Sequence, residues 1–486
     1  MRWTLEEVAR ALGVTPPGGV DALARLAGVS INSRTVARGE LFVAIHGPRH
    51  DGHDYVVAAL EAGALACLVA ADRLARYGEP IRAKLLSVPD TLAALQDLAQ
   101  AVRIRWGRRL AAVTGSAGKT TTKEILAALV ASRFRVLKSE GNLNNEYGLP
   151  LQLLRLEETD EAAVVELGMS RAGELMRLAE IARPDVGVVT RVAPVHLEFF
   201  ASVEEIALAK RELIEGLAGP ESVSVLNADD PLVARFAEVA PGRVITYGVA
   251  ERADFRAENI QDRGLNGSEF DLLGPEGRAR LILPLAGRHN ISNALAALAA
   301  ASVWGVDAAE AREIFPKLEA TGMRGRVLQY DAGFTVINDC YNSNPVALAA
   351  MIGLLTSTPA PGRHILAAGE MLELGPTSSE LHREAGRAAA ATRKLDWIIG
   401  VQGAAENLVR GAIEAGHAAA RTIFCATSEE AGGFVENLIG QGDVLLVKGS
   451  RGVKMERIVE ALDSRFARLQ AEPAASALSG APKECG

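Results

Sequence analysis

The sequence is poor in cysteine and has no arrangement of cysteines that suggests a metal site. Four occur in 486 residues, namely Cys67, Cys340, Cys425 and Cys485, and no two of them form a Cys-x-x-Cys pair. Such wide spacing argues against structural zinc and suits a reducing cytoplasm. We interpret these cysteines as small buried hydrophobic residues or, in the tail, as a surface thiol.

Long hydrophobic runs are also missing. Residues 1–7 lack the apolar segment of a secretory signal. No stretch approaches the roughly 20 apolar residues that cross a bilayer, because Arg, Glu or Gly interrupts the Ala-rich segments. We therefore expect a cytoplasmic protein without membrane insertion.

An excess of positive charge is absent as well. The net charge of −8 gives no general attraction to nucleic acid, so we expect no nucleic-acid partner, and local basic groups must meet any anionic substrate. The length predicts two to four domains. No heptad pattern or long exposed apolar stripe indicates assembly, so a monomer is the default expectation.

Short apolar runs alternate with helical segments, which predicts an α/β protein with parallel sheets. The near-continuous apolar character of the central runs indicates strands buried on both faces of a doubly wound sheet. Residues 254–286 instead predict antiparallel hairpins at its edge, followed by an Ala-rich helix from near residue 291. The central strands are expected at residues 110–114, 162–167, 186–192, 222–226 and 244–247, with a helix at 121–132.

A second α/β series follows, and a smaller unit precedes the central one. We predict a small N-terminal α/β domain (1–90), a central P-loop-type domain with a β-hairpin extension (91–320) and a C-terminal Rossmann-like domain (321–470). Residues 471–486 are expected to be disordered. The C-terminal strands are expected at 334–338, 364–368, 397–401, 422–425 and 444–448; the first unit has a strand at 40–45 and helices near 55–62 and 92–106, the last assigned to the central domain.

A glycine-rich loop between a predicted strand and a predicted helix carries the clearest chemistry. Its backbone N–H groups can point at phosphate oxygens, Lys119 can reach the terminal phosphates, and the Thr120 hydroxyl can join a Mg²⁺ shell. The standard spacing would place a glycine at Val113, and a functionless Gly-Ser turn is the alternative that the Lys-Thr pair disfavours. We predict that ATP is bound by Gly115, Ser116, Ala117, Gly118, Lys119, Thr120 and Thr121.

Two candidate metal ligands follow successive strands of the predicted sheet. Glu166 and His196 would both lie at the carboxyl edge, where doubly wound folds bind ligands. Alone, each would be a solvated glutamate or a hydrogen-bonded histidine. Because Mg²⁺ prefers oxygen ligands, His196 suits a second, less regular site.

Together these segments resemble the Mur ligases, ATP-dependent enzymes that build the peptide stem of peptidoglycan. The similarity extends to about residue 465 and includes Ser33-Arg34, residues 141–150 and Asp-Cys-Tyr-Asn-Ser-Asn-Pro at 339–345. The branch most resembled joins D-alanyl-D-alanine to UDP-N-acetylmuramoyl-tripeptide. The resemblance implies a UDP-sugar-binding first domain, an ATP-binding central domain and a third domain that completes the ligase.

The resemblance also implies residue roles. Lys119, His196 and Lys210 would be catalytic, and Thr120, Glu166, His196 and Lys210 would hold two Mg²⁺ ions. Lys210 matches the lysine that family members carbamoylate, although its sequence context alone predicts an exposed helical lysine. The remaining assignments are Asn290 at the adenine, Arg326 at the phosphates and Asp339 at the ribose, with Ser33, Arg34, Asn144, Asn145, Tyr341, Asn342 and Asn344 at the substrates.

Two positions depart from the family pattern. Asn32 stands where an aspartate is usual before Ser33-Arg34, which puts uracil or ribose contacts there in question. Glu370 replaces the usual aspartate of Gly-Asp-Met-x-Glu-Leu-Gly, keeping the charge with a longer reach.

The implied reaction forms an amide through an acyl phosphate. It needs a base for the attacking amine, and both His196 and His382 are candidates. A sibling ligase, adding the third stem residue or a glutamyl unit to folate, is the nearest alternative. A P-loop NTPase switch is a second one, which leaves the first- and third-domain segments unexplained.

Overall fold

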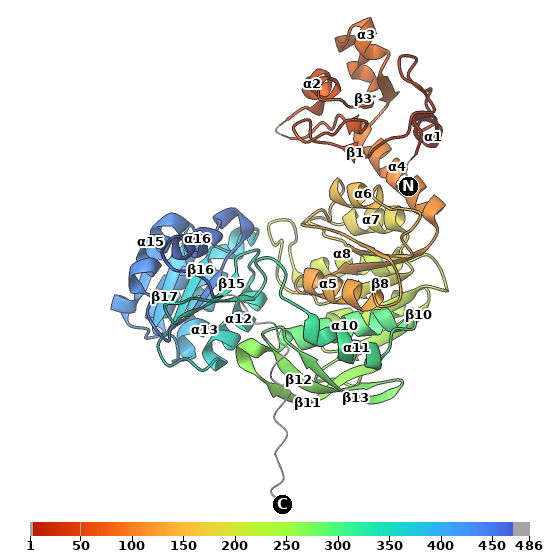
Figure 1. Cartoon of the computed structure of the whole chain (residues 1–486). Helices are drawn as coiled ribbons and strands as arrows, with labels where there is room; N and C mark the ends of the chain where they lie inside the picture. The colour runs from red at the N-terminus through yellow and green to blue at the C-terminus, as the bar shows by residue number, and fades with distance from the viewer. Residues whose placement is uncertain (1–2, 49, 470–486) are drawn as a thin grey trace, which may run out of the picture.

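The structure is a computed structural model that describes residues 3–48 and 50–469. Three sheets follow one another along the chain, and helices cover each of them (Figure 1). The α/β class with three sheet-based units is therefore confirmed. The disorder predicted for residues 471–486, and Cys485 with it, lies outside the described residues.

The first unit is a small parallel sheet in the order β1-β2-β3-β4. The predicted strand at 40–45 corresponds to the shorter β2, whereas the other three strands were not predicted. Its elements are α1 (Leu5–Ala11), β1 (Val29–Ser30), β2 (Leu41–Val43), α2 (Val56–Glu61), β3 (Ala66–Ala70), α3 (Glu79–Arg82) and β4 (Leu85–Val88).

The central sheet has the order β13-β12-β11-β10-β9-β8-β5-β7-β6. All pairs from β6 to β11 are parallel, and the antiparallel β12 and β13 extend the same sheet, which confirms the predicted hairpins. Its strands are β5 (Arg109–Thr114), β6 (Val136–Lys138), β7 (Ala162–Glu166), β8 (Val186–Val189), β9 (Val223–Asn227), β10 (Arg243–Gly248), β11 (Phe255–Asp262), β12 (Ser268–Gly274) and β13 (Gly277–Leu283).

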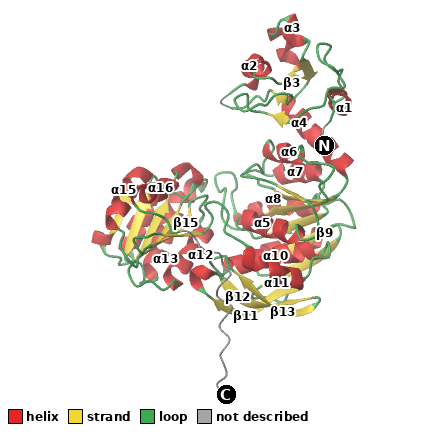
Figure 2. Ribbon diagram, viewed as in Figure 1, coloured by secondary structure: helices red, strands yellow, loops and turns green. Residues whose placement is uncertain are grey.

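Helices cover both faces of the central sheet (Figure 2). The Ala-rich α10 is buried along most of its length and packs on α5, the helix that follows the glycine loop. The helices are α4 (Thr91–Trp106), α5 (Lys119–Val130), α6 (Gly148–Leu153), α7 (Glu174–Ala182), α8 (Val203–Glu215), α9 (Pro231–Ala234), α10 (His289–Ser302) and α11 (Ala308–Ile314).

The third unit is a sheet in the order β14-β15-β19-β16-β17-β18, parallel except for the edge strand β14. The five predicted strands are present within one residue of their expected bounds, and β14 was not predicted. Its elements are β14 (Arg326–Gln329), β15 (Thr335–Asp339), α12 (Pro345–Ser357), β16 (His364–Gly369), α13 (Ser378–Ala391), β17 (Trp397–Val401), α14 (Ala405–Glu414), β18 (Thr422–Cys425), α15 (Ser428–Leu438), β19 (Val444–Lys448) and α16 (Glu456–Arg465).

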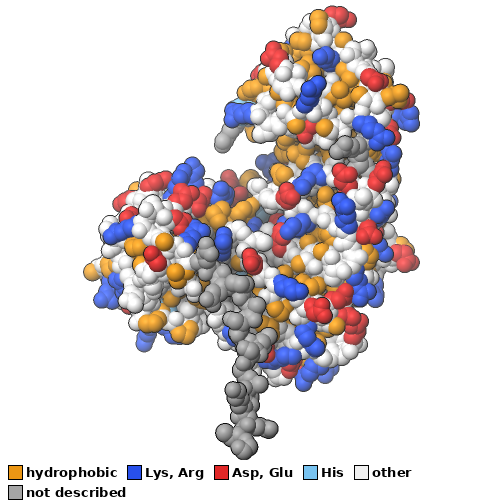
Figure 3. Space-filling model, viewed as in Figure 1, with side chains coloured by type: hydrophobic (Ala, Val, Ile, Leu, Met, Phe, Trp, Pro, Cys, Tyr) orange, Lys and Arg blue, Asp and Glu red, His pale blue; other side chains and the backbone are white. Residues whose placement is uncertain are grey.

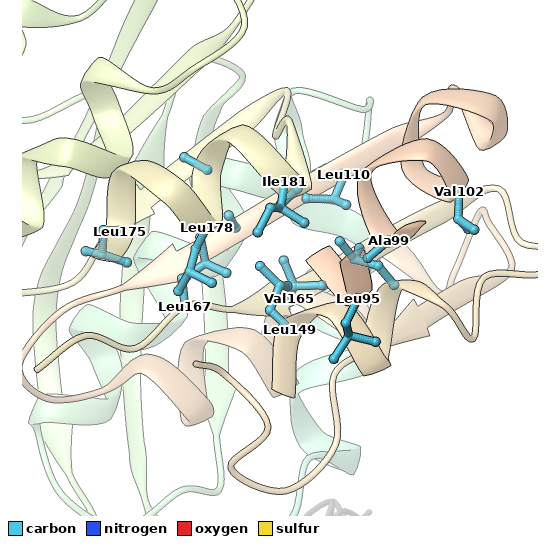
Figure 4. Packing of buried hydrophobic residues seen from close by; sticks show 14 of the residues in the cluster. Leu95, Ala99, Val102, Leu110, Leu149, Val165, Leu167, Leu175, Leu178 and Ile181 are labelled. Carbon is cyan, nitrogen blue, oxygen red and sulfur yellow. The ribbon is translucent and has the colours of Figure 1, made fainter. Parts of the chain in front are cut away.

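Helix α4 ties the first unit to the central one. Leu95 and Ala99 of α4 point toward Leu149 of α6 and Val165 of β7 (Figure 4), and all four side chains are fully buried. The same cluster continues into the first unit through Leu5. The helix predicted at 92–106 therefore packs on the central domain, as expected.

The surface mixes charges of both signs. In Figure 3, Lys and Arg side chains are interspersed with Asp and Glu over all three units. Among the described residues, no helix is both long and apolar enough to cross a membrane.

Candidate active site

The glycine loop runs from the end of β5 into α5, and two of its glycines are sterically required. Gly115 has a φ of +144°, and a Cβ there would lie 1.9 Å from the Thr190 hydroxyl oxygen. Gly118 has a φ of +86°, and a Cβ there would lie 2.3 Å from Oδ1 of Asn293. Because Gly118 takes the left-handed conformation and ends the loop, α5 begins at Lys119, two residues before the predicted start.

Side chains from neighbouring elements hold this loop in place. The Thr190 hydroxyl, just past β8, donates to the carbonyl of Ala117 at 2.6 Å. The Ser116 hydroxyl and the Ala193 backbone exchange two hydrogen bonds, of 3.1 and 2.9 Å. Thr190 and Asn293 carried no assignment from the sequence, since only the fold brings β8 and α10 against the loop.

Lys119 lies over the loop that precedes it. Its ammonium group donates to the carbonyl of Gly115 at 2.8 Å. Burial lowers the pKa of Lys119, and the nearby Glu166 carboxylate opposes that shift. Arg324 and Glu373, from the linker and the third unit, also act electrostatically on this lysine. Lys119 is thus the point where groups from two units meet.

The predicted metal ligand Glu166 is buried at the end of β7, with 4% of its surface exposed. Its Oε2 accepts the Thr120 hydroxyl at 2.6 Å, and its Oε1 accepts the Asn144 amide at 2.8 Å. The structure therefore brings three predicted site residues into direct contact. Asn145 instead accepts the Gly148 N–H at 2.9 Å at the start of α6, a local structural role.

Lys210 is not the exposed lysine that its sequence context alone predicted. It lies on the inner face of α8, is 2% exposed and is acted on electrostatically by Lys119. Burial lowers its pKa well below the ordinary value. Among the described residues, no acceptor lies within hydrogen-bond distance of its amine. Burial of a charged amine without an acceptor is costly, so this environment favours the neutral form.

The two candidate bases occupy different environments. Nδ1 of His196 lies 2.5 Å from Oε2 of Glu373, at the meeting of the central and third units. His382 is fully buried inside the third unit, where Nε2 accepts the Met371 N–H at 2.9 Å and Nδ1 donates to the Ser378 carbonyl at 2.7 Å. Both nitrogens of His382 serve the backbone, so the prediction that it could act as the base is wrong.

The third unit presents a buried ion pair at the carboxyl end of its sheet. Nζ of Lys448 lies 2.6 Å from Oδ2 of Asp339 and donates to the carbonyl of Asn342 at 2.8 Å. Asp339 and Lys448 both act electrostatically on His289 at the start of α10, so this pair faces the central unit. The Asn344 side chain accepts the Ala347 N–H at 2.8 Å and caps α12.

A small pocket lies behind the loop, between α5, α10 and the linker to the third unit. Thr121, Asn290 and Arg324 all line it, which places the predicted adenine residue beside the loop. The Arg324 guanidinium lies over the Tyr341 ring, 3.9 Å from its centroid. Arg326 is exposed at the start of β14, so the arginine that the structure places near the loop is Arg324, two residues earlier.

The predicted first-domain residues form a separate group. Ser33 is half-buried and Arg34 is exposed, in a turn where Oδ1 of Asn32 accepts the Arg34 N–H at 3.0 Å. An aspartate could make the same bond, so Asn32 preserves the turn. Glu370 uses its longer reach to accept the Ala404 N–H at 2.9 Å, inside the third unit.

The donor set can be compared with the needs of Mg²⁺. Among the described residues, no group of three His, Cys, Asp or Glu side chains is placed to hold a metal ion. Glu166 and Thr120 supply oxygen donors in contact with each other, as Mg²⁺ prefers. The set fits two ions only if the buried amine of Lys210 carries an added carboxylate.

Comparison with known families covers all three units. Residues 25–103 match the model of the Mur ligase family catalytic domain, residues 113–301 the Mur ligase middle domain, and residues 323–451 the Mur ligase glutamate ligase domain. These matches follow the order of the three sheets along the chain.

Two relatives that match the chain over about nine-tenths of its length have the same name. The chain is 35% identical over 435 residues to UDP-N-acetylmuramoyl-tripeptide--D-alanyl-D-alanine ligase from Bacillus subtilis (strain 168), covering 90% of this chain and 93% of the relative. The Escherichia coli (strain K12) protein of that name is 35% identical over 443 residues, covering 89% and 93%.

Solved structures of proteins called MurF have the same fold as this chain. MurF from Acinetobacter baumannii superposes with a TM-score of 0.85 at 28% identity, covering 96% of this chain and 99% of that one. MurF ligase from Thermotoga maritima in complex with ADP has a TM-score of 0.77 at 28% identity, covering 90% and 97%. With family matches over all three units and relatives 35% identical across nine-tenths of its length, the chain belongs to the Mur ligase family.

Proposed function

We propose that this chain is an ATP-dependent ligase that joins D-alanyl-D-alanine to UDP-N-acetylmuramoyl-tripeptide, giving the pentapeptide precursor of peptidoglycan, ADP and phosphate. The observation that carries the proposal is the contact of Thr120, Glu166 and Asn144 beneath the glycine loop, with Lys119 and the buried Lys210 beside them. Relatives that bear this ligase name, at 35% identity over most of their length, support the choice of substrates.

The reaction takes two steps. A carboxylate oxygen of the tripeptide attacks the γ-phosphorus of ATP, the bond from that phosphorus to the bridging oxygen of ADP breaks, and an acyl phosphate forms. The neutral amine of D-alanyl-D-alanine then attacks the acyl carbon, phosphate leaves and the amine loses a proton. The first step brings together two anions, so Lys119 and the loop N–H groups must offset their repulsion.

Thr120, Glu166, His196 and a carbamoylated Lys210 would hold two Mg²⁺ ions. When bound, these ions neutralise charge on the phosphates. Carbamoylation needs a neutral amine, and the surroundings of Lys210 favour one. The product would be an anionic oxygen donor where the described residues otherwise lack one.

Because both nitrogens of His382 are engaged, His196 is the remaining candidate for the base that accepts the amine proton, a role its Nε2 can play only while that nitrogen holds no metal ion. Arg324 joins Lys119 as a second cation for the phosphates, since it lines the pocket that contains Asn290. The half-buried Ser33 and the exposed Arg34 would bind the UDP end of the substrate, in the first unit.

The decisive experiment is the mass of the product after incubation with ATP, Mg²⁺, UDP-N-acetylmuramoyl-tripeptide and D-alanyl-D-alanine. Competing amines, namely diaminopimelate, lysine and glutamate, test the sibling ligases in parallel. We expect a mass increase that corresponds to D-alanyl-D-alanine less one water. Transfer of another amine, or ATP hydrolysis that needs no amine, would replace the proposal with one of its alternatives.

The phosphate loop has its own test. Lys119→Ala is expected to abolish phosphate release in the presence of both substrates, because nothing then offsets the charge of the transferred group. Lys138→Ala is the matched control, since Lys138 is a half-exposed lysine of the same sheet that pairs with Glu124. Turnover at the wild-type rate in Lys119→Ala would remove this loop from the mechanism.

A further inference from the structure

Two loops from different units meet beside the glycine loop. Residues 196–198 follow β8 of the central sheet, and residues 373–375 follow β16 of the third sheet. The Glu198 N–H donates to the Glu373 carbonyl at 3.3 Å. A Cβ on Gly375 would lie 2.8 Å from the carbonyl oxygen of Leu197, so the approach of the backbones requires glycine there.

The two side chains in contact stand on unusual backbone. His196 has a φ of +57° and Glu373 a φ of +64°, in the left-handed region that non-glycine residues rarely adopt. Such conformations persist where the surrounding structure fixes them, and they concentrate at functional sites. Here both serve one contact, Nδ1 of His196 to Oε2 of Glu373 at 2.5 Å.

Glu373 also lies near the centre of the site. Its carboxylate acts electrostatically on Lys119, and Lys119 acts in turn on Lys210. A residue of the third unit therefore reaches the phosphate-handling lysine of the central unit. Among the described histidines, only His196 contacts a carboxylate of another unit.

We propose that Glu373 is a positioning residue, which holds His196 by Nδ1 when the third unit is closed and leaves Nε2 as the nitrogen available to the site. A carboxylate on one ring nitrogen fixes both the orientation and the tautomer of a histidine. The contact would make the histidine of the central unit depend on the position of the third unit. This inference rests on the ligase activity proposed above.

The test uses the full-length protein in three variants. Glu373→Ala removes the carboxylate, Glu373→Gln keeps an oxygen that can accept from Nδ1–H, and Glu198→Gln is the matched control. Glu198 is exposed, and the described residues include no ion-pair partner for it. Turnover is measured together with nitrogen NMR of ¹⁵N-histidine-labelled protein, in which His196→Gln identifies the His196 signals.

We expect Glu373→Ala to lower kcat by on the order of tenfold or more, within the 10- to 100-fold range for lost supporting carboxylates, with little change in KM for ATP. Its His196 signals should lose the Nδ1–H tautomer pattern. Glu373→Gln should restore most of both properties, and Glu198→Gln should match the wild type.

Wild-type kcat in Glu373→Ala would overturn the inference. So would a loss of kcat with unchanged His196 signals, because that would mean a merely structural role. A wild-type protein that forms no pentapeptide product would refute the proposed function instead, and the His196 signals would still decide whether Glu373 positions this ring.

Discussion

At the scale of single residues, the site consists of ionisable groups removed from water around one lysine. Lys119 lies within electrostatic reach of both Lys210 and Glu166, and these two are almost fully buried. With Lys210 neutral, Lys119 and Glu166 leave one charge of each sign in a largely buried setting. Such a site stabilises the apo fold poorly and is prepared for anionic phosphates.

Replacing Lys210 should therefore change the stability of the fold and the activity in opposite directions. Lys210→Met should keep or raise the free energy of unfolding, by about 1 kcal/mol or more, because the buried amine lacks an acceptor. It should also abolish ligation. Urea titration and a phosphate-release assay measure the two effects.

The pH dependence of the free energy of unfolding is a second test of whether the Lys210 amine is neutral in the folded protein. Since the folded pKa of Lys210 is lowered, the unfolded chain binds a proton that the folded chain lacks, between that pKa and the ordinary value. Stability should therefore rise with pH across this window, and Lys210→Met should lose that part of the slope. An unchanged slope, together with lower stability in the variant, would contradict the neutral amine.

Glu166 allows a nearly isosteric test. Glu166→Gln keeps the shape that contacts Thr120 and Asn144 but removes the negative charge. We expect a cooperative melt close to that of the wild type and a fall in kcat of about 100-fold, because the proposed Mg²⁺ ligand is lost. Asn144→Ala, which removes the amide that donates to that carboxylate, should cost about 10-fold. Equal losses in both variants would argue against a special role of the charge.

At the scale of elements, the glycine that precedes a helix affects the conformation of the loop before it, and α5 and α7 allow a comparison of two such glycines. Gly118 and Gly173 precede α5 and α7 with almost the same φ, +86° and +85°. Only at Gly118 would a Cβ collide, with Asn293, whereas the space around Gly173 is open. Alanine substitutions at these two glycines therefore separate the effect of backbone strain from the effect of the collision with Asn293.

Gly173→Ala should destabilise the fold through strain alone, by about 1–2 kcal/mol, and Gly118→Ala by at least as much, because its Cβ also collides with Asn293. Only Gly118→Ala should also weaken ATP binding, by at least about tenfold, because the loop and Asn293 must move apart. Thermal melts and calorimetric titration with ATP measure these effects. Equal ATP affinity in the two variants would show that the contact with Asn293 is unimportant.

The elements also show what a sequence can predict. Most of the parallel strands of the central and third sheets were predicted, because parallel strands buried on both faces appear in the sequence as continuous apolar runs. The short β1 and β6, of two and three residues, leave no such run. The burial of Lys210 could not be predicted either, because it depends on which face of α8 packs inward. The position of Arg324 beside the loop could not be predicted for a similar reason, because it depends on the course of the linker.

At the scale of the whole molecule, the central and third units share a second contact. Leu265, in the turn between β11 and β12, packs against the hydrophobic core of the third unit, and Ala286 is part of that core. In Figure 1 the β11–β12 hairpin reaches toward α12. The extension of the central sheet therefore supports the third unit on one side, and the contact of His196 with Glu373 joins the two units on the other.

This arrangement predicts that Leu265→Asp loosens the third unit without unfolding it. Placing a charge in the contact should cost on the order of 1 kcal/mol, which corresponds to about a fivefold rise in the open population. Trypsin should then cleave the linker at Lys317 or Arg324 about fivefold faster, since these residues lie between α11 of the central unit and β14 of the third unit. Ile282→Asp, on the exposed side of β13, is the matched control and should be cleaved at the wild-type rate.

Because Arg324 lines the pocket beside the loop, saturating ATP should slow cleavage there in both variants. If Leu265→Asp were cleaved no faster than Ile282→Asp, the hairpin would not be what holds the third unit, and its position would depend on the linker and the contact of His196 with Glu373.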